Sequence, residues 1–435
     1  MNMKYYSTNK QSAPVDFKEA TIKGLAPDKG LYFPETIPQL DLAFINECEK
    51  YTNAEIAYRV ISPYIGNVIP AEKLMQIAHE SINFEIPLVK ITNNISSLEL
   101  YHGPTLAFKD VGARFMSRCL GYFAKEKNER VIVLVATSGD TGGAVANGFY
   151  DVDGVEVVIL YPSGKVSSVQ EKQLTTLGKN IHALEVEGNF DDCQRMVKDA
   201  FADEDLNKQL FLTSANSINV ARWLPQQFYY FFAWKQWKDK NDPPVISVPS
   251  GNFGNICAGL LAYRSGLPVM HFIAACNAND VVPEYFKTGN YTPKKAVATI
   301  SNAMDVGDPS NFVRILEMFK HDPGELKRLV SSYTVNDDET KAVMKHVFEQ
   351  EKYLLDPHGA VAWLALEKYQ AMNNDLKGIF IETAHPVKFY DVVEPVIQQQ
   401  VPIPASVQIQ LDKEKKSTKI AADSNLVKVF LKKIK

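Results

Sequence analysis

The sequence has 435 residues, with 47 basic and 51 acidic side chains and a formal charge of −4 at pH 7. This balance argues against a nucleic-acid or membrane-surface binder and favours a small-molecule partner. Hydrophobic residues make up 46% of the chain and charged residues 23%, which is ordinary for a globular protein and excludes long disordered or fibrous segments. At roughly 150 residues per domain, the length predicts about two to three domains.

Cysteine usage and hydrophobic runs predict a cytoplasmic protein. The five cysteines are far apart and none belongs to a C-x-x-C pair, which fits a reducing compartment. The N-terminal segment lacks the apolar stretch of a secretory signal. The longest purely apolar run, VIVLVA at Val131–Ala136, has the length of a buried strand and falls far short of the roughly 20 residues that cross a bilayer.

Short apolar runs alternate with helical patterns, which predicts an α/β protein with parallel sheets. The first three runs lie close together, with a helical interval at 167–178, and we expect them in one small sheet unit. The next three predict a second unit, and a charged, proline-containing segment at 235–244 is interpreted as a surface linker between the two. The six runs are Val131–Ala136, Val155–Tyr161, His182–Val186, Val245–Pro249, His271–Ala275 and Gly378–Thr383.

The two ends of the chain differ in character from the middle. Residues 1–90 combine turn-like pieces with helical patterns and are interpreted as a separate N-terminal region. The last segment, 411–435, has eight lysines and three acidic residues, so it is either a solvated terminal helix or an anion-binding tail. Val429 and Phe430 lie near Ile434 at core-facing helical spacing, which favours a helix that packs on the core.

Two glycine-bearing loops follow strand-like runs, where α/β proteins bind their ligands. ATSGDTGGAV (136–145) offers hydroxyls, backbone N–H groups and a carboxylate at the start of a helix. PSGNFGNICAG (249–259) has glycines that allow close backbone approach and polar side chains suited to a phosphate. Each loop alone is weak evidence, since such turns are often only turns.

A lysine at position 109 is the main candidate for covalent chemistry. It lies in LELYHGPTLAFKDVGARFM (98–116), between Phe108 and Asp110. A lysine with apolar neighbours loses its proton more easily and can form a Schiff base. Composition alone favours an ordinary surface lysine before a helix.

The segment HGPTLAFKD resembles the lysine motif of the pyridoxal-phosphate enzymes of fold type II, the tryptophan-synthase-β type, and within them the threonine synthase family. Several further segments match that family in order, and the layout is similar to its long bacterial and yeast form. They are 23–38 (KGLAPDKGLYFPETIP), 136–145, 214–227 (SANSINVARWLPQQ), 250–255 (SGNFGN), 301–312 (SNAMDVGDPSNF) and 382–389 (ETAHPVKF).

This resemblance implies two parallel-type α/β domains with the cofactor in the cleft between them. It assigns residues 1–90 to the family's N-terminal region and 91–400 to the catalytic region, with a small subdomain at about 110–215. Residues 401–435 are then a tail that packs on the core.

The resemblance also implies the cofactor site. Lys109 would hold pyridoxal 5′-phosphate and act as acid and base, and the Thr383 hydroxyl would meet the pyridine nitrogen. A buried hydroxyl satisfied by the backbone is the alternative for Thr383. Asp140 would face the cofactor's 3′ oxygen, where many relatives have asparagine, so its carboxylate must be protonated or share a proton; alternatively it only starts a helix. The cofactor phosphate would be bound by Gly251, Asn252, Phe253, Gly254 and Asn255, largely through backbone N–H groups.

A second set of residues is implied for the substrate. The substrate carboxylate would be bound by Thr137, Ser138, Gly139 and Thr141. Its phosphate would be bound by Asn216, Ser217 and Arg222, where a structural salt bridge is the alternative for the arginine.

The implied reaction converts O-phospho-L-homoserine and water to L-threonine and phosphate by γ-elimination and β-hydration, the last step of threonine biosynthesis. The alternatives are another fold-type II lyase, such as a threonine dehydratase or a phospholyase, and a non-catalytic ligand-binding relative. We expect no metal site, because His102, His358 and His385 lack metal-ligand spacing. Asn302 and Asp305 are assigned to packing or turn formation, and a monomer is expected.

Overall fold

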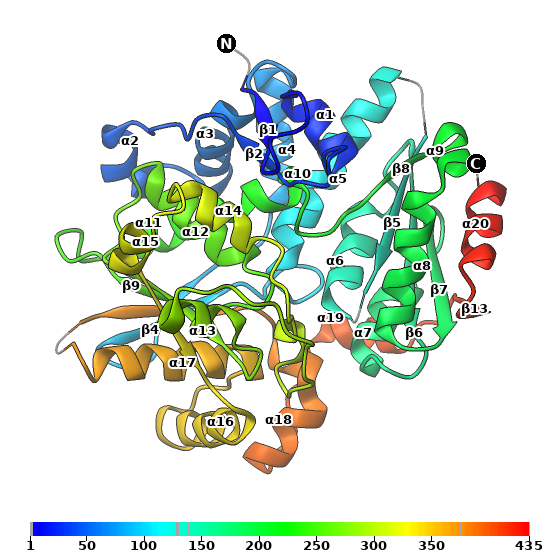
Figure 1. Cartoon of the computed structure of the whole chain (residues 1–435). Helices are drawn as coiled ribbons and strands as arrows, with labels where there is room; N and C mark the ends of the chain where they lie inside the picture. The colour runs from blue at the N-terminus through cyan, green and yellow to red at the C-terminus, as the bar shows by residue number, and fades with distance from the viewer. Residues whose placement is uncertain (1–2, 128–129, 138, 374–375, 435) are drawn as a thin grey trace.

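The computed structural model describes residues 3–127, 130–137, 139–373 and 376–434. Its strands form two large sheets and one two-stranded N-terminal sheet, with helices packed around them (Figure 1). This arrangement confirms the α/β class with parallel sheets that the apolar runs predict.

The smaller of the two large sheets is entirely parallel, in the order β13-β7-β6-β5-β8. The first three apolar runs form its central strands, and hydrophobic cores lie on both faces, which explains why these strands are apolar throughout. The strands are β5 (Val131–Ala136), β6 (Val155–Pro162), β7 (Ile181–Glu187), β8 (Phe211–Thr213) and β13 (Thr418–Ala421). The helices beside them are α6 (Asp140–Phe149), α7 (Ser168–Thr175), α8 (Phe190–Ala202) and α9 (Glu204–Gln209).

The larger sheet has the order β11-β10-β9-β12-β4-β3, with only β3 antiparallel to its neighbour. The other three apolar runs form β9, β10 and β12, as expected, whereas β3, β4 and β11 have no counterpart among the predicted runs. The strands are β3 (Leu88–Lys90), β4 (Ile95–Glu99), β9 (Val245–Pro249), β10 (His271–Cys276), β11 (Val330–Thr334) and β12 (Gly378–Glu382). The helices that follow or cover them are α10 (Val220–Trp223), α11 (Gln227–Gln236), α12 (Gly254–Arg264), α13 (Val281–Thr288), α14 (Phe312–Met318), α15 (Pro323–Leu329), α16 (Asp337–Glu351) and α17 (Pro357–Gln370).

The N-terminal residues pack into the same hydrophobic core as α11 and α12. Their two strands pair antiparallel, and α5, which begins at Lys109, runs beside α6. The division at residue 90 stays a prediction. The elements are β1 (Tyr5–Ser7), β2 (Tyr32–Pro34), α1 (Phe17–Lys23), α2 (Leu42–Asn46), α3 (Asn53–Ile65), α4 (Ala71–Ser81) and α5 (Lys109–Lys127).

The C-terminal segment crosses from the larger sheet to the smaller one (Figure 1). After α18 (Tyr390–Ile397) and α19 (Ala405–Leu411), β13 pairs with β7 and α20 (Ser424–Lys433) packs on α8. The expected core face is wrong at Val429, which is 51% exposed, because Val427 and Leu431 are the residues that α20 turns toward the sheet. Three of the tail's lysines form ion pairs with carboxylates of the smaller-sheet region: Lys415, Lys419 and Lys428.

The proposed linker at 235–244 is only partly a surface segment. Its first two residues end α11, and Trp237 is 7% exposed and donates its indole N–H to the Asp242 carbonyl. Within the described part of the chain, no helix combines the length and apolar character needed to cross a membrane.

Candidate active site

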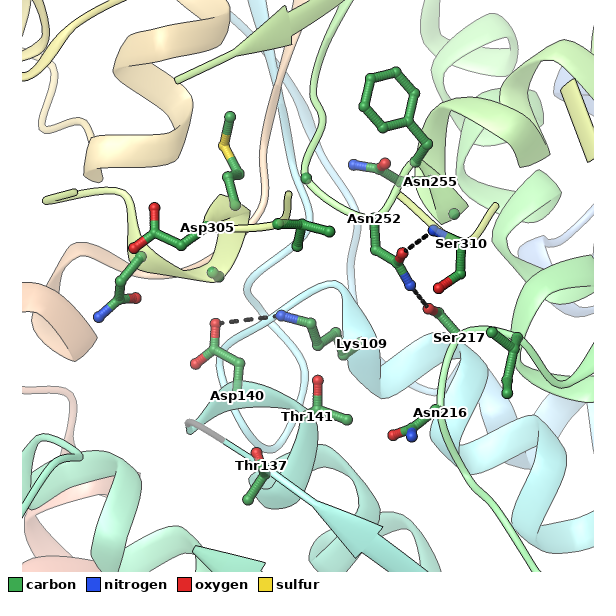
Figure 2. Close-up of a pocket in the computed structure, with 18 of the residues that line it drawn as sticks. Lys109, Thr137, Asp140, Thr141, Asn216, Ser217, Asn252, Asn255, Asp305 and Ser310 are labelled. Carbon is green, nitrogen blue, oxygen red and sulfur yellow. Dashed lines mark hydrogen bonds and ion pairs between the residues drawn. The ribbon is translucent and has the colours of Figure 1, made fainter. Parts of the chain in front are cut away.

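A cavity of about 650 Å³ lies where β5, β9 and β12 end. The carboxyl ends of parallel strands are the usual ligand-binding edge of such sheets. The cavity brings together most of the residues that the sequence singled out, from segments far apart in the chain (Figure 2). These lining residues are Lys109, Thr137, Asp140, Thr141, Asn216, Ser217, Arg222, Gly251, Asn252, Phe253, Gly254, Asn255 and Thr383.

Lys109 is the first residue of α5 and points into the cavity toward Asp140 (Figure 2). Its side chain is 18% exposed, and its Nζ lies 3.7 Å from Asp140 Oδ2. Burial lowers the pKa of Lys109, the nearby positive charges of Lys388 and Arg222 lower it further, and Asp140 opposes them. The surface-lysine alternative is therefore wrong, since most of this side chain is buried and its amine lies in the cavity near the charges of Asp140, Lys388 and Arg222.

Asp140 is the first residue of α6 and is almost fully buried. Lys388 Nζ contacts its Oδ1 at 2.7 Å, and Gln170 Nε2 donates to the same oxygen at 3.1 Å. Burial alone would raise the pKa of Asp140, but Lys388 and Lys109 hold it well below its usual range. These contacts favour an ionised Asp140 and give it partners beyond the start of α6.

The loop 251–255 is an open set of backbone donors at the start of α12. Within the described residues, the N–H groups of Gly251, Asn252, Phe253, Gly254 and Asn255 have no hydrogen-bond acceptor. Phe253 has a positive φ of 61°, which turns the chain sharply into the helix. The result is a concave, positively polarised cradle that suits a phosphate.

Side chains of this loop hold its shape. Asn252 donates to Ser217 Oγ at 2.7 Å and accepts from the Ser310 N–H at 2.7 Å, as the dashed lines in Figure 2 show. Asn255 donates to the Pro249 carbonyl. A Cβ on Gly251 would lie 2.5 Å from Met304 Cα, so only glycine fits there.

The loop before α6 is built differently. The Thr137 hydroxyl accepts hydrogen bonds from Gly139 N at 3.0 Å and Gly142 N at 2.9 Å. Gly139 is the N-cap of α6 and is not among the lining residues of the cavity, whereas Thr141 is. Ser138 lies outside the described residues. The assignment of this loop to a substrate carboxylate stays a prediction.

Arg222 is 4% exposed and lines the cavity, yet it forms no ion pair with any carboxylate of the described residues. One of its terminal nitrogens donates to the Ala215 carbonyl, and its Nε has no partner in the described part of the chain. Burial lowers its pKa to about 10, with Asp110 opposing, so it stays charged at neutral pH. A salt bridge is therefore not its structural role, and the guanidinium is available for an anion.

Family models match nearly the whole chain. Residues 4–82 match the threonine synthase N terminus, 92–378 the pyridoxal-phosphate dependent enzymes and 359–431 the threonine synthase C-terminal family. The threonine synthase of Haemophilus influenzae is 45% identical over 93% of this chain and 94% of its own length. That of Serratia marcescens is 43% identical over 99% of both chains.

This chain belongs to the threonine synthase family.

Solved structures agree with this assignment. The crystal structure of threonine synthase from Escherichia coli has a TM-score of 0.91 at 40% identity and covers all of both chains. The structure of threonine synthase from Brucella melitensis with bound PLP has a TM-score of 0.94 at 34% identity over 99% of each chain. A tomato threonine deaminase with a TM-score of 0.58 at 15% identity shares the fold alone. These findings confirm the fold-type II class and the family's long form.

The residues present fit the family's cofactor, pyridoxal phosphate. A buried amine at Lys109 lies in one cavity with the open N–H groups of 251–255, which match the cofactor's aldehyde and phosphate. Thr383 follows β12. Among the described residues, no group forms a hydrogen bond with its hydroxyl, so the structure does not show the alternative in which a backbone group satisfies this hydroxyl. Its hydroxyl is available to a ring nitrogen.

Sequence reasoning missed the two residues that contact Asp140 from other elements. Lys388 lies inside the matched segment ETAHPVKF, but its contact with Asp140 joins distant parts of the chain. Gln170 reaches Asp140 from α7. The one available signal was a lysine within an apolar stretch, PVKFY.

Hydrogen bonds tie His358 and the 301–312 segment to the surrounding structure. His358 Nδ1 lies 2.5 Å from Asp356 and its Nε2 accepts from Ala303 N, while Asp305 accepts hydrogen bonds from Asn277 and Thr299. Asp305 and Asn302 also line the cavity. Among the residues described, no group of three His, Cys, Asp or Glu side chains is arranged to hold a metal ion.

Proposed function

We propose that this chain converts O-phospho-L-homoserine and water to L-threonine and phosphate. The observation that carries the proposal is the pairing of two different anion sites in one cavity with Lys109: five open N–H groups at 251–255 and the uncompensated guanidinium of Arg222. Cofactor and substrate each carry one phosphate, so two sites match this reaction. The names of the relatives support it.

Lys109 is the proposed acid and base. Pyridoxal phosphate, when bound, supplies an electron sink that stabilises negative charge on the carbons next to the substrate amine. Because burial and neighbouring cations lower the pKa of Lys109, its amine can take the proton from the substrate Cα at neutral pH and return it later in the reaction.

Arg222, Asn216 and Ser217 are proposed to hold the substrate phosphate. The guanidinium offers paired, charged donors that a phosphate matches, and the Asn216 side chain has no partner among the described residues. Ser217 is bonded to Asn252, which links the substrate-phosphate site to the cofactor-phosphate loop. Binding at both sites orients the substrate over the Lys109 amine.

The loop 137–141 is proposed to hold the substrate carboxylate at the start of α6. The start of a helix favours an anion, and Thr137 and Thr141 line the cavity. Asp140 stays ionised and is proposed to face the cofactor's 3′ oxygen.

The experiment is to incubate the protein with pyridoxal phosphate and O-phospho-L-homoserine and to measure threonine and inorganic phosphate together. Equal amounts of the two products are expected. Phosphate with 2-oxobutyrate in place of threonine would support the phospholyase or dehydratase alternative. Neither product would favour a ligand-binding relative, which borohydride reduction and peptide mapping would then test at Lys109.

We also propose a monomer in the cytoplasm. All five cysteines are buried and free, in keeping with a reducing compartment. Gel filtration with light scattering would test the monomer, and a dimer mass would overturn it.

A further inference from the structure

Asp140 stands between two buried lysines, and the two contacts are unequal. Lys388 Nζ is 2.7 Å from Oδ1, while Lys109 Nζ is 3.7 Å from Oδ2. The side chain of Lys388 is 0% exposed, and that of Asp140 is 5% exposed. The closer and fully buried lysine therefore holds the carboxylate.

Lys388 is fixed from several directions. It lies in η4 (Pro386–Phe389) just beyond β12, and its Nζ also donates to the Thr105 carbonyl at 2.8 Å. Its own carbonyl accepts from the Ser167 hydroxyl, which caps α7. The side chain thus reaches from the larger-sheet region to α6 and is held at both its ammonium group and its backbone carbonyl.

Charge counting gives the consequence for Lys109. One carboxylate cannot neutralise two buried ammonium groups, and Lys388 already neutralises Asp140. Asp140 still raises the pKa of Lys109, but burial and the positive charges of Lys388 and Arg222 act against it, and together they lower the pKa of this amine.

The other titratable groups around this cluster make no ion pair with Lys109 among the described residues. Asp110 is buried next to Lys109 in the chain; burial raises its pKa, while the hydrogen bonds from the Thr105 hydroxyl and N–H and the charge of Lys388 act against burial, and its two oxygens accept from Thr105 rather than from Lys109. Burial lowers the pKa of His385, on the same segment as Lys388, to about 4, so this ring is neutral. Gln170, the other partner of Asp140, is uncharged.

We propose that Lys388 is a positioning residue that commits Asp140 to itself and so leaves Lys109 as the neutral, reactive amine. This rests on the proposed role of Lys109 as the cofactor-binding lysine. A buried ion pair adds little to stability compared with apolar packing, so its place beside the reactive amine points to a role in reactivity.

The test is the pH dependence of Lys109 labelling. The full-length protein, freed of bound cofactor with hydroxylamine, is mixed with pyridoxal phosphate at pH 5.5 to 10, reduced with borohydride, and the Lys109 peptide is quantified by mass spectrometry. Removing the Lys388 charge leaves Asp140 to pair with Lys109. In Lys388→Met the labelling midpoint should therefore rise by about 1 pH unit or more.

Three further variants separate charge from packing. Lys388→Arg keeps the charge and should stay within about 0.3 pH unit of the wild type, whereas Asp140→Asn should lower the midpoint. The double variant Asp140→Asn/Lys388→Met should return toward the wild-type value, because both charges are gone. If Lys388 acted only through packing, Lys388→Arg would not keep the wild-type midpoint, and the double variant would not return toward it.

The outcomes distinguish this inference from the proposed function. Labelling absent from Lys109 in the wild type would overturn the proposed function. Labelling in the wild type with an unchanged midpoint in a folded Lys388→Met variant would overturn only the inference. If Lys388→Met does not fold, the Asp140→Asn variant is compared with the double variant Asp140→Asn/Lys388→Met. Equal labelling midpoints in these two proteins would contradict the proposal.

Discussion

The loops that precede α6 and α12 both follow a parallel strand, carry glycines and begin a helix at the cavity. Before α6, the Thr137 hydroxyl accepts hydrogen bonds from the N–H groups of Gly139, in the loop, and Gly142, in the first turn of the helix, and Asp140 brings a negative charge of its own. In the loop 251–255, the five N–H groups stay open. The comparison teaches that two similar helix starts can differ in how many donors they leave open, and the open donors of 251–255 are what support the proposed role of that loop as a phosphate site.

The largest expected effect is at Lys109, which lies between the two loops. Lys109→Ala should lower threonine formation by at least about 1,000-fold, because the variant loses the amine that binds the cofactor and moves protons. The measurement is product formation together with the borohydride label. Lys198→Ala is the matched control, since Lys198 lines the same cavity but is exposed; an equal loss there would contradict the assignment.

The second proposed phosphate site relies on the Arg222 side chain rather than on backbone N–H groups. Arg222→Ala should lower kcat/KM for O-phospho-L-homoserine by about 100-fold, because a charge-assisted contact to the phosphate is lost. The absorbance of the bound cofactor should not change. Arg195→Ala removes an exposed arginine paired with Asp192 and should have no effect. A loss in Arg222→Ala no greater than in this control would refute the substrate-phosphate site.

Gly251→Ala is expected to close the open loop. The added Cβ would meet Met304 Cα, so the loop must shift and its donors lose their convergence. The dissociation constant for pyridoxal phosphate, measured by absorbance titration, should rise by about 30-fold. Gly324→Ala, at an exposed helix start, is the control and should bind normally. An unchanged dissociation constant for pyridoxal phosphate in Gly251→Ala would contradict the proposed role of the 251–255 N–H groups.

The smallest effect is expected at Thr137, where stability should respond more than cofactor affinity. Thr137→Val removes the acceptor of two buried N–H groups, so the free energy of unfolding should fall by about 1–2 kcal/mol. The change is read from urea denaturation. Thr213→Val is the matched control, because the Thr213 hydroxyl is buried without a partner in the described residues. If the affinity of Thr137→Val for pyridoxal phosphate fell by more than about 10-fold, the proposal that only the 251–255 loop binds the cofactor phosphate would be contradicted.

The central strands are predictable from the sequence, because they are buried on both faces and leave continuous apolar runs. The two loops are predictable from the glycines and polar residues that follow those runs. Apolar runs do not reveal the half-buried edge strands β3 and β11, whose stability comes from neighbours already in place. Val429 illustrates another limit, since helical spacing alone does not say which of two adjacent faces meets the sheet.

For the site, the resemblance supplies Lys109 and the anion-binding segments, but the partners of those residues come only from the fold. The Lys388–Asp140 contact joins η4 to α6, and no local pattern encodes it. The open N–H groups of 251–255 are likewise invisible in a sequence, because whether a donor is satisfied depends on every acceptor that packs nearby.

The short strand β13 has a consequence for self-association. It covers the outer edge of β7, whose own N–H and C=O groups would otherwise form an unpaired template for a second chain. β13 is itself only four residues long and carries Lys419, paired with Glu187 across the ladder, so the new edge is brief and charged. The C-terminal tail thereby replaces the seven-residue edge of β7 with a shorter, charged edge on this side of the sheet.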